Sequence, residues 1–177
     1  LAPTKDCALV RATAARQAFE GTGRYDRAHK TLRTLAVLGR EVVHAWVRPE
    51  RKDWHGLRGR PVALRRADAD TLRTALGFAN LGLAALVLQS PDDPLAAARA
   101  GSIDAWFEVS LPASPTADAL AALGWQPLKF KPDEQLLLLD EGWPLEWKKR
   151  SELGMAGAGE ALAVPLALVC DESVPRA

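Results

Sequence analysis

The sequence predicts an α/β fold with mostly parallel sheets, because short apolar, β-prone runs alternate with alanine-rich amphipathic stretches along the chain. Such alternation is typical of strand-helix-strand units around a sheet. A second indication is that glycine, serine and proline stand where helices of this kind would begin and end. Strands are expected at residues 7–10, 42–47, 61–64, 85–88, 103–107, 127–130 and 162–169.

Helices are predicted where a capping residue or a glycine flanks an amphipathic stretch. A serine or aspartate before a helix satisfies free backbone N–H groups, and a glycine after it adopts the left-handed conformation at little cost. The predicted helices are residues 12–20 ending at Gly21, 70–79 beginning at Asp70, 91–100 between Ser90 and Gly101, and 116–123 ending at Gly124.

Composition and charge limit the classes of protein to which this chain can belong. The 177 residues are 48% hydrophobic, which is enough to bury the core of one domain or of two small lobes. Lys and Arg number 23 against 22 Asp and Glu, a net charge of +1, so no global field draws the chain toward nucleic acid. The longest apolar runs fall well short of the roughly 20 residues that a membrane-spanning helix needs. Recognition of a partner must therefore be local.

Cys7 and Cys170 are the only cysteines in the sequence, and without a histidine cluster they indicate no metal centre; no pattern indicates another cofactor. Each lies at the edge of a predicted strand, which allows them to be neighbours in one sheet. We favour two buried free thiols over a disulfide, since sequence spacing does not fix the Cβ geometry that a disulfide requires. Both alternatives stay open at this point.

Segments of the chain follow one another in an order found in a known family. They are Asp6-Cys7-Ala8-Leu9-Val10-Arg11-Ala12-Thr13 with Gly21-Thr22-Gly23, residues 31–38 leading into 42–48, Leu57-Arg58-Gly59-Arg60-Pro61-Val62, Gly101-Ser102-Ile103-Asp104-Ala105-Trp106-Phe107, and residues 161–169. In this order they resemble the TAXI-type solute receptors of tripartite (TRAP) transporters, which have the type 2 periplasmic binding fold. The resemblance rests on the order of the segments over nearly the whole chain.

The resemblance implies a two-lobed fold. We expect residues 1–47 and 128–177 to form the first lobe and residues 48–127 the second. The family begins with a strand, a ligand-binding loop and a helix that have no counterpart before Leu1, so the resemblance implies an incomplete first lobe. In the family's second lobe, small flexible residues form a ligand loop where this sequence has Arg65, Arg66, Asp68 and Asp70.

The resemblance also implies a function. A member of this family is a receptor whose lobes close over a small anionic ligand, such as an amino acid or another carboxylate, and present it to the subunits of a membrane transporter. We therefore expect a periplasmic or extracytoplasmic location, although no signal peptide is visible in the sequence. No nucleophile elbow, P-loop or dinucleotide-binding glycine pattern predicts an enzyme.

Candidate ligand-binding residues follow the ends of predicted strands, where ligands of open α/β sheets bind. Arg65 and Arg66 can make bidentate contacts to an anion, and Thr71 lies where a loop meets a helix N-terminus. Alternatively, these residues are a helix cap and solvated arginines, or Asp68 or Asp70 occupies the anion position. Glu108 would suit a ligand amine. The candidates are Arg11, Thr13, Trp46, Arg65, Arg66, Asp70, Thr71, Glu108, Ser110 and Pro112.

Two other functions stay open. The first is a degenerate binding domain that acts as a sensor or a protein-interaction module without a ligand; it would have a collapsed cleft in which Arg65 and Arg66 pair with Asp68 or Asp70. The second is the effector-binding domain of a transcription regulator, which would need a DNA-binding segment that is not visible in the sequence.

Overall fold

The computed structural model describes residues 7–51, 53, 55–78, 86–128, 145–155 and 160–171. The strands are β1 (Cys7–Arg11), β2 (Leu32–Val47), β3 (Pro61–Leu64), β4 (Val87–Gln89), β5 (Ala105–Ser110), β6 (Gln126–Pro127), β7 (Glu146–Lys149) and β8 (Glu160–Asp171). The helices are α1 (Ala12–Glu20), α2 (Ala69–Phe78), α3 (Pro94–Ala100) and α4 (Pro115–Ala122), with short 3-10 turns at His55–Leu57, Arg66–Asp68 and Arg150–Leu153. The predicted α/β class is confirmed.

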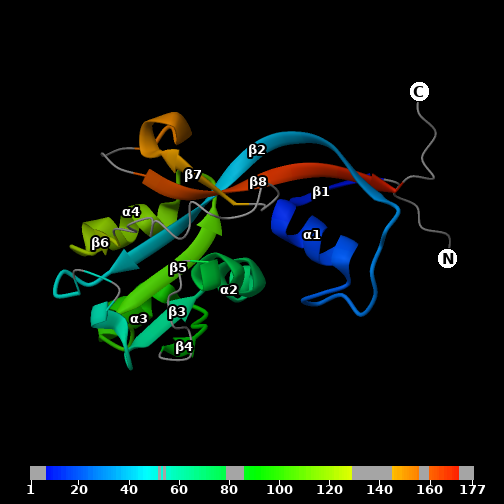
Figure 1. The fold of residues 1–177 in the computed structure, drawn as a ribbon. Coiled ribbons are helices and arrows are strands. Elements are labelled where there is room, and N and C mark those ends of the chain that lie inside the picture. Colours follow the sequence, from blue (N-terminus) through cyan, green and yellow to red (C-terminus); the bar gives the residue numbers. More distant parts are fainter. Residues whose placement is uncertain are drawn as a thin grey trace.

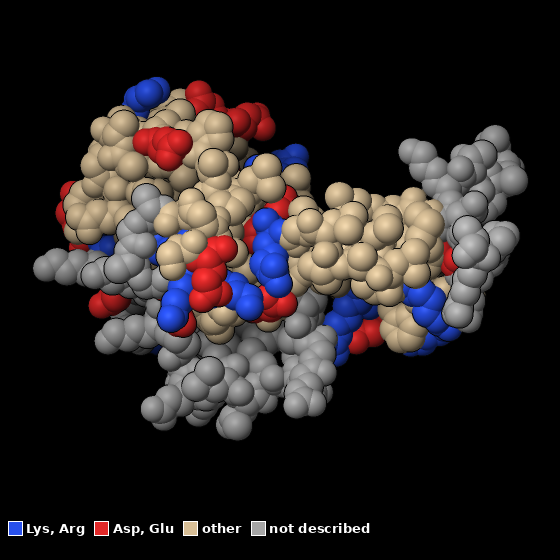
Figure 2. Space-filling view, turned by 90° about the horizontal axis from the view of Figure 1, so that it is seen from above, with Lys and Arg blue, Asp and Glu red and all other residues tan. Residues whose placement is uncertain are grey.

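Two long strands, β2 and β8, run through both parts of the molecule (Figure 1). They pair antiparallel from Leu32 opposite Asp171 to Val42 opposite Ala163. At one end they carry β1 and α1, and at the other end β3, β4, β5 and the remaining helices gather around them. Seen from above, the first part is a narrow lobe that projects from the larger one (Figure 2). The fold is thus two-lobed, while the lobe boundaries that we place at residues 47 and 128 stay a prediction.

The described strands form one sheet in the order β1-β8-β2-β5-β3-β4, with β6 beside β2 and β7 beside β8. Strand β3 pairs parallel with both β4 and β5, as the sequence predicts. All other described pairs are antiparallel. The expectation of mostly parallel strands therefore holds only for β4-β3-β5 in the larger lobe, because the crossing strands β2 and β8 run in opposite directions.

The core of the larger lobe lies on both faces of this parallel group. On one face Leu72 of α2 is fully buried in the cluster that contains Val62 and Phe107. On the other face Ala98 of α3 and Leu120 of α4 pack in the cluster that contains Trp106. Each large apolar side chain buried in this way stabilises the fold by about 1.5–3 kcal/mol. The helices therefore hold the ends of β3 and β5 in fixed positions.

Helix α1 covers the predicted residues 12–20. The following Gly21 has a φ of 73°, in the left-handed region, and a Cβ there would lie 2.5 Å from the backbone nitrogen of Ala28. Glycine is therefore needed for both the turn and the close approach. No helix among the described residues is long and apolar enough to cross a lipid bilayer.

The predicted caps of the other helices need correction. Helix α3 begins one residue after Asp93, whose carboxylate accepts a hydrogen bond from the Ala96 N–H, so Asp93 and not Ser90 is its N-cap. Helix α2 begins at Ala69 and follows the 3-10 turn directly, so Asp70 lies inside the helix and is not its cap. At α3 the nearby Asp93 met the sequence criterion as well as Ser90 did, whereas α2 continues directly from the 3-10 turn.

Two strand predictions also differ from the structure. Strand β2 begins ten residues before the predicted residue 42. Its first half contains exposed apolar side chains, at Leu35, Val37 and Leu38, and two β-bulges, between Thr34 and Ala36 and between Val37 and Gly39. This half lacks the regular alternation of apolar and polar residues that marks a half-buried strand. Strand β7 was not predicted at all. Parts of the predicted strands at 85–88 and 127–130, and residue 79 of the predicted helix, lie outside the described residues.

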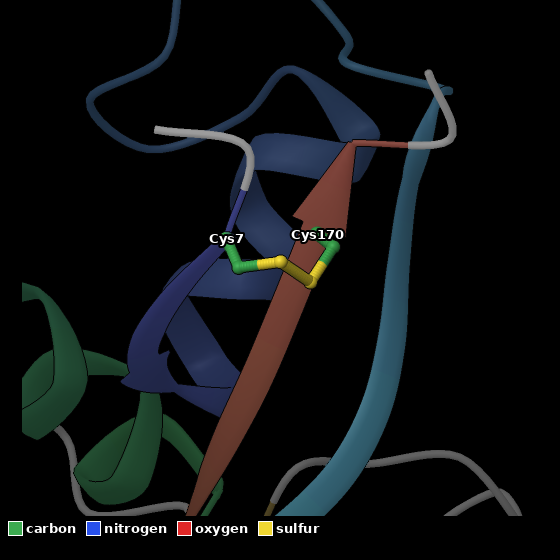
Figure 3. Close-up of a disulfide and its surroundings, with 2 residues drawn as sticks. All are labelled: Cys7 and Cys170. Carbon is green, nitrogen blue, oxygen red and sulfur yellow. A yellow bond between two sulfur atoms is a disulfide. The ribbon is translucent and has the colours of Figure 1, made fainter. Parts of the chain in front are cut away.

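Cys7 on β1 and Cys170 on β8 form a disulfide (Figure 3). The register of the two strands places these residues directly opposite each other, with their Cα atoms 4.0 Å apart. The prediction that they are neighbours in one sheet is confirmed, whereas the preference for free thiols is wrong. The reason is that antiparallel pairing brings opposed positions within disulfide range, and this register is not visible in the sequence.

Reduction of this disulfide should lower the free energy of unfolding by about 2–5 kcal/mol, because the bond joins residues far apart in the sequence and so restricts the unfolded chain. Urea denaturation with and without reductant measures the change. The Cys7→Ala/Cys170→Ala double variant is the control, since reductant should leave its midpoint unchanged. Equal midpoints for the oxidised and reduced natural sequence would contradict the expectation.

Candidate functional site

The carboxylate of Asp68 joins the two lobes. It lies in the 3-10 turn after β3, and only 1% of its side chain is exposed. Its oxygens accept hydrogen bonds from Arg11 Nη1 at 2.7 Å, from Arg65 Nε at 2.5 Å and from the backbone N–H of Val109 at 2.9 Å. Because Arg11 ends β1 while Val109 belongs to β5, one carboxylate links the narrow lobe to the sheet of the larger lobe.

Glu41 on β2 completes this ion cluster, which we define as Arg11, Glu41, Arg65 and Asp68. The Nε and Nη2 groups of Arg11 both donate to the Glu41 carboxylate. Arg11 and Arg65 also donate to the backbone carbonyl of Val109. Figure 2 shows basic and acidic side chains intermixed where the narrow lobe meets the larger one. The two arginines and two carboxylates balance in charge, so the cluster has no excess positive charge for a bound anion.

The ion cluster matches one of the two alternatives that the sequence leaves open for the arginines. Asp68 occupies the position that a bound carboxylate would take, with two guanidinium groups and one backbone N–H around it. This is the internal pairing that the sequence allowed as an alternative to ligand binding. As ligand contacts, Arg11 and Arg65 stay predictions.

Other predicted residues meet beside the ion cluster. Thr13 of α1 and Thr71 of α2 are both buried, with their hydroxyl oxygens 3.2 Å apart. Asp70 lies 3.8 Å from the guanidinium of Arg73 and, with Arg11 and Thr71, lines a cavity of about 170 Å³. The structure therefore brings these predicted residues together at the lobe junction, where the two threonines connect the helices α1 and α2.

A larger cavity, of about 360 Å³, lies at the carboxyl ends of β3 and β4. In an open α/β sheet this edge is where ligands bind, since the strand ends and the loops after them leave a crevice. We call it the strand-end cavity. Its polar and charged lining residues are Arg65, Arg66, Ser90, Asp92, Trp106, Glu108 and Thr116.

Three of these side chains have groups that no described residue satisfies. The indole N–H of Trp106 is buried, with 3% of the residue exposed, and has no hydrogen-bond partner among the described residues. Glu108 is 2% exposed, and its Oε1 accepts hydrogen bonds from the hydroxyls of Ser110 and Ser114, while no described residue donates to its Oε2. Arg66 is exposed and forms no ion pair with a described residue. The cavity therefore offers the Arg66 guanidinium as a free donor and a Glu108 oxygen as an acceptor, while the Trp106 N–H is buried and has no described partner.

Besides Thr13, which contacts Thr71, three predicted site residues line neither cavity. Trp46 is half-buried and packs against the apolar cluster around Trp106. Ser110 supports the site indirectly, because its hydroxyl donates to Glu108 at 3.3 Å. Pro112 is half-buried between β5 and α4. As direct ligand contacts, these three residues stay predictions.

Sequence reasoning missed Glu41 and Ser114. A signal for Ser114 was present, since a serine before a proline often begins a helix, and here Ser114 caps α4 by accepting from the Ala117 N–H. Glu41 had no such signal. Its role depends on the position of β2 relative to β1, which local sequence does not define.

His44 on β2 lies opposite Glu108 on β5 and is 5% exposed. Burial lowers the pKa of His44, although its hydrogen bond to the carbonyl of Leu111, at 3.0 Å from Nε2, and the charge of Glu108 act in the opposite sense. The folded protein therefore favours the neutral imidazole, whose Nε2–H donates to Leu111.

Comparisons with known proteins give similarity at the level of structure only. No protein-family model matches the chain, and no curated protein matches it. Among solved structures, the chain is similar to the periplasmic aliphatic sulphonate binding protein SsuA from Escherichia coli (TM-score 0.47, 18% identity, 92% of this chain and 47% of that chain). It is also similar to the solute receptor for L-cysteine of Neisseria gonorrhoeae (0.45, 13%, 94% and 59%) and to the desulfurization enzyme DSZB (0.47, 14%, 94% and 55%).

The chain spans about half the length of these solved structures. Two of the three are binding proteins and one is an enzyme. With TM-scores below 0.5, these similarities carry no argument about what this chain binds, so its function must be argued from its own residues.

Replacing Asp68 by asparagine should lower the free energy of unfolding by about 3 kcal/mol, because Arg11 and Arg65 then lose their shared carboxylate in a buried position. Urea denaturation measures the loss. The control Asp26→Asn changes an exposed carboxylate and should shift stability by no more than about 0.5 kcal/mol. If Asp68→Asn behaves like the control, the ion cluster does not hold the lobes together.

Stability should fall as the pH is lowered from 7 to 5, in part because of His44. The unfolded chain takes up a proton at the ordinary histidine pKa, whereas the folded chain, with its lowered pKa, resists protonation. The contribution is at most about 1.4 kcal/mol per pH unit for one proton. Urea midpoints at several pH values should show a shallower pH dependence for His44→Gln than for the natural sequence. His29→Gln, at a histidine outside this site, should keep the original slope.

Proposed function

We propose that this chain is a solute-binding domain that captures a small anionic solute, an amino acid or another carboxylate, in the strand-end cavity. The observation that carries the proposal is the free positive charge in that cavity. Arg66 is exposed and lines the cavity, and no described residue neutralises its charge. A bound carboxylate would pair with this guanidinium, since charged hydrogen bonds in a partly dry site are stronger than in water.

The proposed receptor works outside the cytoplasm with a TRAP-type transporter. The resemblance of the sequence segments to TAXI-type receptors supports the transporter as partner. The Cys7–Cys170 disulfide supports the location, because disulfides persist in oxidising compartments such as the periplasm. In this role the domain binds its solute and releases it unchanged.

The ion cluster favours a second candidate function, a degenerate domain that no longer takes up a ligand between its lobes. Arg65 pairs with Asp68, as the collapsed cleft of such a domain requires. Arg66 does not pair in this way, and it keeps the strand-end cavity available for a solute. The two functions therefore differ in whether this cavity binds anything.

Thermal denaturation with millimolar carboxylates distinguishes the two functions. The probes are acetate, propionate, succinate, glutarate, L-alanine, L-aspartate and L-glutamate. A probe present at about 100 times its Kd should raise Tm by roughly 5–10 °C. The shift should be largely lost in Arg66→Ala and kept in Arg58→Ala, which removes an exposed arginine that does not line the cavity. No shift with any probe would contradict the receptor and favour the degenerate domain.

A further inference from the structure

We propose that two copies of this chain pair through the narrow lobe, and that helix α1 of each copy fills an apolar groove on the other. This groove lies between α1 and the first half of β2, and it shares no lining residue with the strand-end cavity. The inference therefore goes beyond the proposed function and does not depend on it.

The narrow lobe carries much of the exposed apolar surface of the molecule. Of the nine large apolar side chains that are exposed among the described residues, five belong to β1, α1 and the first half of β2. These five are Leu9, Phe19, Leu35, Val37 and Leu38. Apolar surface gathered in this way marks an interaction site or a ligand groove. A partner of the chain is therefore to be sought at this lobe.

Helix α1 covers only part of the narrow-lobe sheet. In the described part of this lobe the sheet consists of β1, β8 and the first half of β2, and α1 packs on β1 and β8 (Figure 1). A helix is about 10 Å wide and neighbouring strands lie about 4.8 Å apart, so one helix covers about two strands. Consequently Val37 on β2 stays 53% exposed. The uncovered strand leaves room for a second helix beside α1.

The groove at this position has a volume of about 450 Å³ and mostly apolar walls. Ala167 and Val169 of β8 line it together with Val37 of β2. These side chains lie on one face of the sheet, because Val37 pairs with Ala167 and residues two apart on a strand point the same way. Phe19 of α1, which is 40% exposed, lines the opposite wall. No described side chain fills the space between these walls, so their apolar surface faces solvent.

Helix α1 of a second copy has the surface that this groove requires. Its groove-facing side is an apolar stripe at helical spacing, formed by Ala12, Ala15 and Phe19. Arg16 and Glu20 border the stripe, with 35% and 40% of their side chains exposed, and lie 2.7 Å apart within the helix. When two such helices run antiparallel about a two-fold axis, Arg16 of one copy faces Glu20 of the other. The charges are thus self-complementary, as an interface between identical copies requires.

One further charge borders the groove. Arg33 lines it where β2 begins, and its guanidinium donates to the backbone carbonyls of Lys30 at 2.6 Å and of Leu32 at 3.0 Å. Arg33 is exposed, so its stem can cover apolar surface while its charge stays in water. The pairing therefore does not require this charge to be buried. In the pair, each narrow-lobe sheet is covered by its own α1 and by the α1 of the other copy.

Sedimentation equilibrium of the natural sequence tests for the pair. We expect a monomer–dimer equilibrium with a Kd on the order of 10 µM, because one helix and one groove per copy make an interface at the small, weak end of the known range. The measurement covers protein concentrations from about 1 µM to about 200 µM, on both sides of this value. A chain that stays monomeric throughout overturns the inference.

Two matched variants assign the interface to the groove. Val37→Asp should raise the Kd at least about tenfold, because pairing would bury an unpaired carboxylate. The control is Leu9→Asp: Leu9 is 55% exposed on the same lobe but lies on the other face of the sheet, opposite Leu168. It should change the Kd by no more than about twofold. If Leu9→Asp abolishes the pair and Val37→Asp keeps it, the interface is on the other face and the inference fails.

Charge reversal tests the orientation of the two helices. Arg16→Glu and Glu20→Arg each place like charges opposite one another in a homodimer, so each variant alone should raise the Kd about fivefold or more. An equimolar mixture of the two variants should restore pairing, because every reversed charge then faces an opposite one across the interface. A mixture that stays monomeric excludes the antiparallel α1 pair. If Val37→Asp does not fold, this mixing experiment still decides, since Arg16 and Glu20 are both partly exposed.

Discussion

The arrangement of the two lobes depends on the buried carboxylate of Asp68. A charge that is 1% exposed must be compensated by nearby donors, and the chain supplies them from β1, from the residue after β3 and from the backbone of β5. These segments are far apart in the sequence, so the cluster fixes their relative positions. Glu41 on β2 extends the same constraint to the longest strand.

This constraint also determines the character of the strand-end cavity. Arg65 lines the cavity but is held by Asp68, so it contributes little free charge. Arg66, the next residue in the chain, is exposed and forms no ion pair with a described residue. The neighbouring arginines therefore differ, since Arg65 belongs to the lobe junction while Arg66 is the residue that we propose for recognition. The ion cluster and the strand-end cavity therefore lie side by side with opposite properties. The charges of the ion cluster compensate one another, whereas the cavity keeps unsatisfied polar groups.

The sequence predicted those parts of the fold that depend on local signals. The helix at residues 12–20 and the strand at 61–64 agree with the structure because periodicity and end residues define them. The first half of β2 was missed because its apolar residues do not alternate regularly with polar ones, and because two β-bulges interrupt its pairing with β8. The disulfide was undervalued because it follows from the register of β1 against β8.

The candidate site shows a similar division. Residues at strand ends, such as Arg66 and Glu108, were selected because the position of ligand sites in α/β sheets is a general rule. A contact between β1 and the turn after β3 determines which of the arginines is neutralised. No local sequence pattern encodes this contact. Glu108 could be named because it follows the predicted strand at 103–107, although β5 extends to Ser110, and its hydrogen bonds became visible only with the positions of Ser110 and Ser114.

The disulfide closes nearly the whole chain into a covalent ring, since Cys7 and Cys170 are 163 residues apart. A protease that cuts once in any loop between them leaves a single covalent molecule whose fragments stay joined at β1 and β8. The two fragments are then held at high effective concentration, so the noncovalent core can re-form around the cut. A domain built in this way tolerates a surface nick that would separate an open chain into two independent pieces.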